Sequence, residues 1–150
     1  MHPHSFKSVA LILFATSIFV GGCSTVNPAR TQAGNNLSNF KTVYVVTHGG
    51  SSVDMDTHLQ NTLLDRGLKV SAGSENAKPI NVDMYAIYTD TWRWDLTMYL
   101  KSLQIQFYET KNGTLIASGS FSNGILHSWP DAGKKVAEVV ATMYGEKRPE

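Results

Sequence analysis

Apolar and polar residues alternate over several stretches of this chain, and the alternation predicts strands. Residues 42–48 are β-branched or aromatic on both faces, which predicts a central strand buried on two sides. Residues 82–89 alternate in a similar way and predict a second, largely buried strand. The segment 68–72 is long enough only for a short strand.

The strongest hairpin signal lies at residues 111–113, Lys-Asn-Gly, which tolerate positive φ and separate two apolar runs. These runs, 103–108 and 114–122, predict two paired strands. Upstream of them, the apolar residues of 92–100 occupy even positions, whereas those of 103–108 occupy odd positions. One bulge or short break at residues 100–102 reconciles both halves within a single long strand.

Two further segments repeat apolar residues at helical spacing. The first predicted helix starts at a cap on Ser51 or Ser52 and ends at Gly67. Its core stripe consists of Met55, Leu59 and Leu63, with Leu64 beside them. The second opens at Ser128 and Asp131, which have capping-box spacing, and ends at Gly145. Its core stripe consists of Val136, Val139, Val140 and Met143.

The order of these elements predicts the fold class. Consecutive strands flanked by two helices indicate an α+β domain with a single mixed or antiparallel sheet of about four to five strands and both helices packed on one face. The predicted domain covers residues 40–145, and a polar tail covers 146–150. A chain of 150 residues is too short for two well-filled cores, so one domain is expected.

The amino-terminal residues follow another pattern. Lys7 is the only formal charge before an apolar run from Val9 to Val20, and Gly21-Gly22 then leads into Cys23. This run of twelve residues is too short to span a bilayer as a helix, which takes about 20. Residues 1–22 are therefore predicted to be a secretory signal peptide.

The sequence Val20-Gly21-Gly22-Cys23 resembles the lipobox of bacterial lipoproteins. The resemblance implies cleavage before Cys23 and triacylation of that cysteine, including palmitate-type chains, which together give stable membrane anchoring. Ser24 stands where Asp is the usual signal for retention in the inner membrane, which points to the outer membrane with the domain facing the periplasm. Residues 23–39, rich in Ser, Thr, Asn and Gln, are predicted to be the lipidated cysteine and a flexible tether.

Composition narrows the function further. Removing 22 residues from 150 leaves 128, in which Lys7 is absent and 12 basic side chains balance 12 acidic ones. A neutral chain lacks the dense basic face that nucleic-acid binding needs, so no nucleic-acid partner is expected. Cys23 is the only cysteine, which excludes an intramolecular disulfide.

The element order, the lipobox and the hairpin sequence of residues 104–119 together resemble small envelope lipoproteins. Their domain is similar to the amino-terminal domain of TolB and to curli-transport-type and penicillin-binding-protein-activator lipoproteins. The resemblance is one of architecture over residues 40–144, and no signature residue carries a binding site across. It implies the α+β fold and an envelope location, and a shared fold does not assign a function.

Catalytic and metal-binding patterns are weak. The run His48-Gly49-Gly50-Ser51 is similar to part of a hydrolase oxyanion loop, but the surroundings of Ser118 lack the Gly-x-Ser-x-Gly elbow, so a tight strand-to-helix turn is the simpler interpretation. On a helix, Asp54 and His58 share a face whereas Asp56 does not, and a catalytic zinc needs three protein ligands. His127 is interpreted as a loop or cap residue. We therefore expect no catalytic residue, no metal and no cofactor.

Aromatic residues around the sequence Trp-Arg-Trp-Asp suggest a contact surface. In an extended segment, Trp92 and Trp94 point to one side and Arg93 and Asp95 to the other. Either both tryptophans cover the core, or they form an interaction patch, since Trp, Tyr and Arg are enriched in interface hot spots. The candidate patch consists of Trp92, Arg93, Trp94, Tyr99 and Tyr108, with Trp129 as a weaker candidate.

These features predict a non-enzymatic lipoprotein of the outer membrane that serves as a protein-interaction or envelope-assembly accessory module. Its expected partners are the membrane, through the lipid on Cys23, and an unknown envelope protein or a second copy of itself. The alternatives are a carrier that binds a small ligand or glycan through the aromatic patch and, with less support, a hydrolase that uses His48 with Ser51 or Ser118.

Overall fold

The computed structural model describes residues 25–31, 36–48, 53–124 and 129–146. The strands are β1 (Thr25–Thr31), β2 (Thr42–Val46), β3 (Lys69–Gly73), β4 (Met84–Asp95), β5 (Thr97–Glu109) and β6 (Leu115–Ser122). The helices are α1 (Val53–Asp65) and α2 (Ala132–Met143), with short 3₁₀ turns η1 (Leu37–Asn39) and η2 (Glu75–Ala77).

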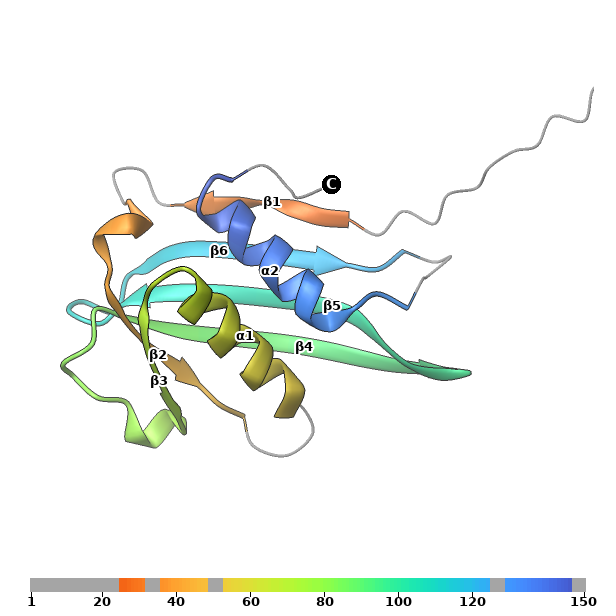
Figure 1. Cartoon of the computed structure of the whole chain (residues 1–150), viewed down its shortest axis with the longest axis horizontal. Coiled ribbons are helices and arrows are strands. Elements are labelled where there is room, and N and C mark those ends of the chain that lie inside the picture. The colour runs from red at the N-terminus through yellow and green to blue at the C-terminus, as the bar shows by residue number, and fades with distance from the viewer. Residues whose placement is uncertain (1–24, 32–35, 49–52, 125–128, 147–150) are drawn as a thin grey trace, which may run out of the picture.

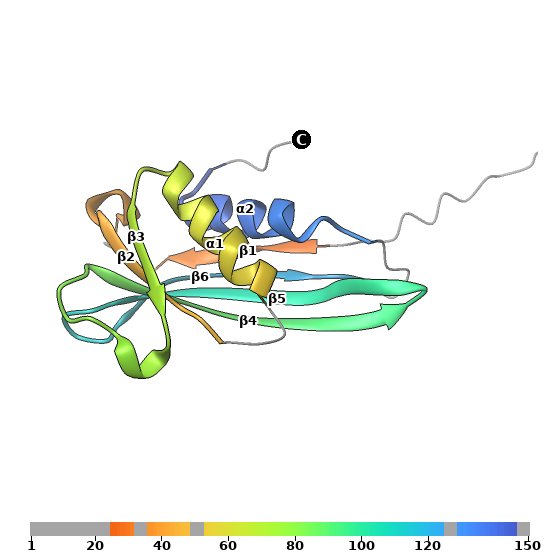
Figure 2. The ribbon, with the colours of Figure 1, turned by 60° about the horizontal axis from the view of Figure 1, so that its bottom comes forward.

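The strands form one sheet in the order β1-β6-β5-β4-β2-β3 (Figure 1). β2 runs parallel to β3 and β4, whereas the pairs from β4 to β1 are antiparallel, so the sheet is mixed. Both helices lie on the same face of the sheet (Figure 2). The sheet has six strands, so the predicted number of four to five is wrong.

The additional strand, β1, lies within residues 23–39, where a flexible tether was predicted. Its sequence has little apolar content, but Val26 is only 4% exposed in the core, and the Thr31 hydroxyl donates to the Met143 carbonyl oxygen at 3.2 Å. A register shift between Asn27 and Arg30 accommodates Pro28 on this edge strand, where a missing N–H costs no ladder bond. Residues 25–31 are therefore part of the domain.

The predicted long strand 92–108 is divided between two strands. β4 continues to Asp95, the chain turns at Leu96 with φ of 59°, and β5 begins at Thr97. The sequence missed this turn because it lacks Gly or Asn, the residues that usually occupy the left-handed region. The predicted bulge is confirmed: pairing shifts from Thr91–Ser102 to Trp92–Leu100 and leaves Lys101 as the extra residue on β5.

The turn between β5 and β6 lies at residues 111–113, where the sequence predicted it. Gly113 has φ of 69°, which glycine adopts without steric cost. The Asn112 side chain accepts from the Thr114 N–H at 2.9 Å and donates to the Glu109 carboxylate at 2.7 Å. The Lys-Asn-Gly sequence therefore fixes this hairpin through local bonds.

Helix α1 covers β2 and β3 with the predicted stripe. Met55, Leu59 and Leu63 are at most 1% exposed, whereas Leu64 is 51% exposed and does not belong to the stripe. The helix ends at Asp65, and the predicted stop residue Gly67 follows with φ of 78° and its N–H bonded to the Leu64 carbonyl at 2.8 Å. The predicted caps Ser51 and Ser52 lie outside the described residues.

Helix α2 begins later than the sequence suggested. Its cap is Asp131, whose carboxylate accepts from the Lys134 N–H at 2.6 Å, and Trp129 and Pro130 precede the helix. Ser128, the other predicted cap, lies outside the described residues. The predicted stripe is buried, and it consists of Val136, Val139, Val140 and Met143.

The hydrophobic core fills the space between the sheet and the helices. β2 is buried on both faces, because Val43 and Val45 pack into this core while Tyr44 is covered on the opposite face. There the Tyr44 hydroxyl donates to the Ser74 carbonyl at 3.0 Å, and Tyr85 donates to the Pro79 carbonyl at 2.9 Å. The η2 segment thus covers one end of the face that lacks helices.

Candidate functional site

Exposed apolar side chains gather at the tip of the β4–β5 hairpin. Trp94 is 72% exposed, Leu96 is 83% exposed and Met98 is 54% exposed. Trp94 and Met98 are cross-strand partners, and Trp129, half exposed, donates its indole N–H to the Asp95 carbonyl oxygen at 3.3 Å. We call the set Trp94, Leu96, Met98 and Trp129 the hairpin-tip surface.

Trp92 does not belong to this surface, although the sequence grouped it with Trp94. It is half buried against the core, and its indole N–H donates to the Asp90 carboxylate at 2.6 Å. Its cross-strand partner, Leu100, is fully buried. Of the two tryptophans, Trp92 covers the core and Trp94 extends past it.

The other members of the predicted patch lie elsewhere. Arg93 and Tyr99 are cross-strand partners, and strand alternation places them on the face opposite Trp92 and Trp94. Tyr108 pairs with Tyr85 near the other end of β5, nine residues from Tyr99, or about 30 Å along the strand. The five predicted residues therefore do not form one surface.

Leu96 and Met98 are the residues that the sequence-based patch missed. The sequence did contain a signal for these two residues, because Trp94, Leu96 and Met98 occupy alternate positions and are all apolar. Period-2 spacing shows that residues share a face, but it does not show where the covering helices end. The helix layer stops short of the hairpin tip, which leaves these side chains uncovered (Figure 1).

The hairpin tip and the first residue of β1 lie at the same end of the molecule, the right-hand end of Figure 1. Thr25 pairs with Ser122, Ser122 with Ser102, and Ser102 with Thr91, so these residues lie at one level across the sheet. Leu96 follows Thr91 by five residues. The hairpin thus projects about 16 Å beyond the start of β1.

The structure does not bring His48 and Ser118 together as a hydrolase pair. His48 follows β2, where its Nε2 lies 2.7 Å from the Tyr88 carbonyl oxygen and its ring packs edge-on against the Tyr88 ring. Ser118 is on β6, which two strands separate from β2, or about 14 Å at normal strand spacing. Ser51 lies outside the described residues.

Asp56, in the first turn of α1, has a structural partner. The Asp56 carboxylate accepts from the Tyr88 hydroxyl at 2.7 Å, and burial, followed by this bond and the nearby charge, raises the pKa of Tyr88 far above its usual range. Among the described residues, no three His, Cys, Asp or Glu side chains lie close enough to hold a metal ion. His127 is outside that part of the chain.

The described residues form a small α+β domain with an exposed apolar surface at the hairpin tip. Solved structures with a similar fold include the PelC dodecamer from Paraburkholderia phytofirmans and a single-substitution variant of it. The PelC dodecamer has 18% identity and a TM-score of 0.59 over 78% of this chain and 98% of that one. The variant has 15% identity and a TM-score of 0.59 over 81% of this chain and 99% of that one. At this identity the likeness shows the fold alone.

Sequence comparisons add nothing to this likeness, because no protein-family model and no curated protein matches the chain. Within the described part of the chain, no helix is both long enough and apolar enough to cross a bilayer.

Proposed function

We propose that this protein is a non-enzymatic, lipid-anchored accessory module of the outer membrane, and that its hairpin-tip surface lies against the bilayer. The observation that carries the proposal is the position of this surface at the same end as the start of β1. The sequence motif at Val20-Gly21-Gly22-Cys23 supports the anchor, because lipidation of Cys23 would attach the membrane next to β1.

The length of chain between anchor and domain supports a close approach. Cys23 precedes Thr25 by two residues, which span at most about 7 Å. The hairpin tip projects about 16 Å beyond the level of Thr25, at the end of the molecule where β1 starts. With Cys23 at the headgroup level, the tip would reach at least about 9 Å farther, a depth typical of residues at the boundary between headgroups and acyl chains.

The residue types of the surface suit that depth. Tryptophan side chains are enriched where an apolar layer meets water, because the indole has an apolar body and one polar N–H. Trp94 and Trp129 are of this type, and Leu96 and Met98 add purely apolar area. Scattered exposed apolar residues need no explanation, whereas four at one projecting tip favour a contact surface.

Self-association is part of the proposal. It is supported by the PelC structures, which are dodecamers of chains with a similar fold. An assembly of lipid-anchored copies would need all hairpin tips on one side, which an interface elsewhere on the domain permits.

A vesicle-flotation experiment tests the membrane contact. The lipid-free chain of residues 24–150 should float with vesicles of phosphatidylethanolamine and phosphatidylglycerol, and the triple variant Trp94→Ser, Leu96→Ser and Met98→Ser should float much less. The control is Ile80→Ser, which removes a 92% exposed apolar residue near the start of β4, at the other end of that strand.

Equal flotation of the triple variant and the control would contradict the proposal. Circular dichroism would establish that each variant is folded. Fluorescence changes with soluble cell-wall fragments, without vesicle binding, would instead support the glycan-carrier alternative.

A further inference from the structure

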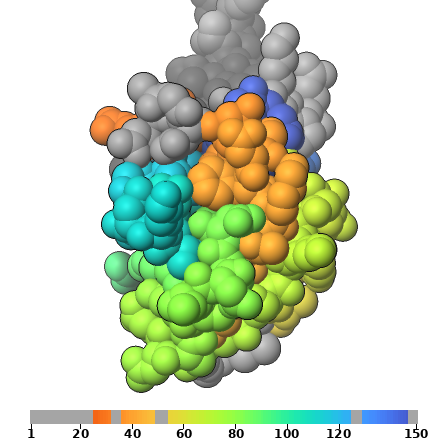
Figure 3. Space-filling model, turned by 90° about the vertical axis from the view of Figure 1, so that its left-hand side faces the viewer, coloured from red at the N-terminus to blue at the C-terminus, as the bar shows by residue number. Residues whose placement is uncertain are grey.

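A hollow of about 410 Å³ lies at the end of the molecule opposite the hairpin tip. Figure 3 looks onto this end, where the η1–β2 segment lies beside the carboxyl-terminal end of α2. The hollow is bounded by three segments, namely 37–41, 65–68 and the end of α2 at Tyr144 and Glu146. The ends of both helices and the segment before β2 therefore meet around it.

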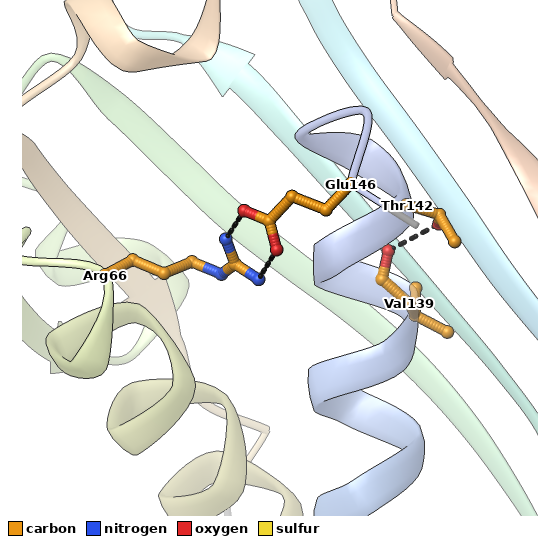
Figure 4. Close-up of polar contacts among 4 residues, drawn as sticks. All are labelled: Arg66, Val139, Thr142 and Glu146. Carbon is orange, nitrogen blue, oxygen red and sulfur yellow. Dashed lines mark hydrogen bonds and ion pairs between the residues drawn. The ribbon is translucent and has the colours of Figure 1, made fainter. Parts of the chain in front are cut away.

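Arg66 and Glu146 pair across this hollow (Figure 4). The guanidinium Nη1 and Nη2 donate to the two carboxylate oxygens at 2.5 and 3.0 Å. The Arg66 side chain is 19% exposed and Glu146 is 51% exposed, so the cation is held in the wall while its partner lies at the rim. The guanidinium carbon also lies 4.7 Å from the centroid of the Tyr144 ring.

The end of α2 determines where Glu146 lies. Gly145 has φ of 74°, its N–H bonds to the Thr142 carbonyl, and the Glu146 N–H bonds to the Ala141 carbonyl. This is a Schellman motif, which fixes the backbone of Glu146 just after the helix. The side chain beyond it is half exposed.

Two polar atoms of residues that line the hollow have no hydrogen-bond partner among the described residues. They are Nε of Arg66 and the hydroxyl oxygen of Tyr144, and both are covered from solvent. An unmade hydrogen bond at a buried polar atom is costly, so such atoms often mark the place of an unseen ligand or water. Both groups can donate, which favours an acceptor as the missing partner.

We propose that this hollow is a receptor for a carboxylate, and that Glu146 is its built-in competitor. Arg66 presents five N–H donors, of which Glu146 uses two, and Lys41 adds a second positive charge to the lining. An incoming carboxylate takes the place of Glu146 on Nη1 and Nη2 of the guanidinium, and the Tyr144 hydroxyl, which has no partner among the described residues, donates to it as well.

The charges around the hollow support an anionic ligand once Glu146 leaves. Arg66 and Lys41 supply two positive charges, and Asp65 then supplies the remaining negative one. Burial raises the pKa of the Tyr144 hydroxyl, so this group stays protonated and able to donate at neutral pH. A planar carboxylate matches the fork of an arginine side chain better than a monatomic anion does.

A titration followed by ¹⁵N NMR tests the proposal on the chain of residues 24–150. The probe is N-acetyl-alanine, and its neutral methylamide is the matched control. We expect the acid, and not the amide, to shift the backbone signals of Gly67 and Gly145. Glu146→Gln should raise the affinity about threefold to tenfold, and Tyr144→Phe should lower it by a similar factor.

Arg66→Lys should abolish the shifts while it keeps the positive charge, because lysine lacks the planar fork. Thermal unfolding of each variant shows whether a lost signal comes from lost folding. The proposal is overturned if Glu146→Gln binds no tighter than the wild type, or if the acid and the amide shift the same signals equally.

Discussion

Asp83 connects the starts of two strands with the end of a third. Its carboxylate accepts from the N–H groups of Lys41 and Thr42 at 2.7 and 2.8 Å, and its own N–H donates to the Thr42 hydroxyl at 2.8 Å. Its carbonyl oxygen accepts from the Thr110 N–H at 3.0 Å. The backbone donors of Lys41 and Thr42 lower the pKa of Asp83, because they stabilise the charged carboxylate.

This lowered pKa predicts a pH dependence of stability. A carboxyl group whose pKa falls on folding stabilises the fold above its unfolded pKa, about 3.9, and that contribution is lost as the pH falls through the lower folded value. We expect Asp83→Asn to lower the free energy of unfolding at pH 7, and the gap to the wild type to close below pH 4. Urea denaturation across this range measures the gap, and a gap that stays constant would contradict the prediction.

Gly119 on β6 packs so closely against α2 that a larger side chain at this position should destabilise the fold. A Cβ atom there would lie 2.9 Å from Cγ1 of Val139 and 3.0 Å from Cγ of Met143 on α2. Because both neighbours are buried, Gly119→Val should destabilise the fold by about 1–3 kcal/mol through overpacking. Ser118→Val, on the opposite face of the same strand, is the control for chemical denaturation and should have the smaller effect.

At the scale of elements, β1 is the least expected part of the fold. Its sequence has few apolar residues, and its strand conformation depends on pairing with β6 and on contact with α2. Edge strands of this kind have weak local signals, since β-propensity reflects the surface against which a strand packs.

Val26 tests whether β1 belongs to the domain. Val26→Ala should lower the free energy of unfolding by about 2 kcal/mol, because the side chain is buried and its truncation leaves a cavity. Arg30→Ala, an exposed change in the same strand, should have little effect. Equal values for both variants in urea denaturation would mean that residues 25–31 act as a tether after all.

At the scale of the whole molecule, the proposed lipid anchor predicts how the variant Cys23→Ala is processed. The variant should accumulate as an unprocessed precursor without attached lipid, because the lipobox peptidase and the acyl chains both require the cysteine. Membrane fractionation with mass spectrometry of the intact chain measures this. Unchanged mass and unchanged extraction by detergent would contradict the anchor.

Self-association is also a property of the whole molecule. We expect the lipid-free chain of residues 24–150 to form an oligomer at tens of micromolar, as judged by size-exclusion chromatography with light scattering. The triple variant at the hairpin tip is the control, since a surface directed at the membrane should not be needed for assembly. A wild type that stays monomeric would contradict the prediction, and loss of assembly in the triple variant would place the interface at the tip.

The sequence was most informative where local chemistry decides the structure. Gly113 and Asn112 made the β5–β6 turn predictable, whereas the β4–β5 turn at Leu96 carries no such residue and was missed. The stripe of Met55, Leu59 and Leu63 was readable because helical spacing alone places these residues on one face.

The sequence by itself determined both helical stripes, the glycine turns and the bulge at Lys101, because each depends on neighbouring residues. Only the tertiary structure decided that β1 joins the sheet, that Trp92 is half buried while Trp94 is exposed, and that Arg66 meets Glu146. These features depend on which distant segments lie beside one another and on where the helix layer ends. The spacing of apolar residues shows which residues share one face of a strand or helix. Only the packing of the whole chain determines which other segments cover that face.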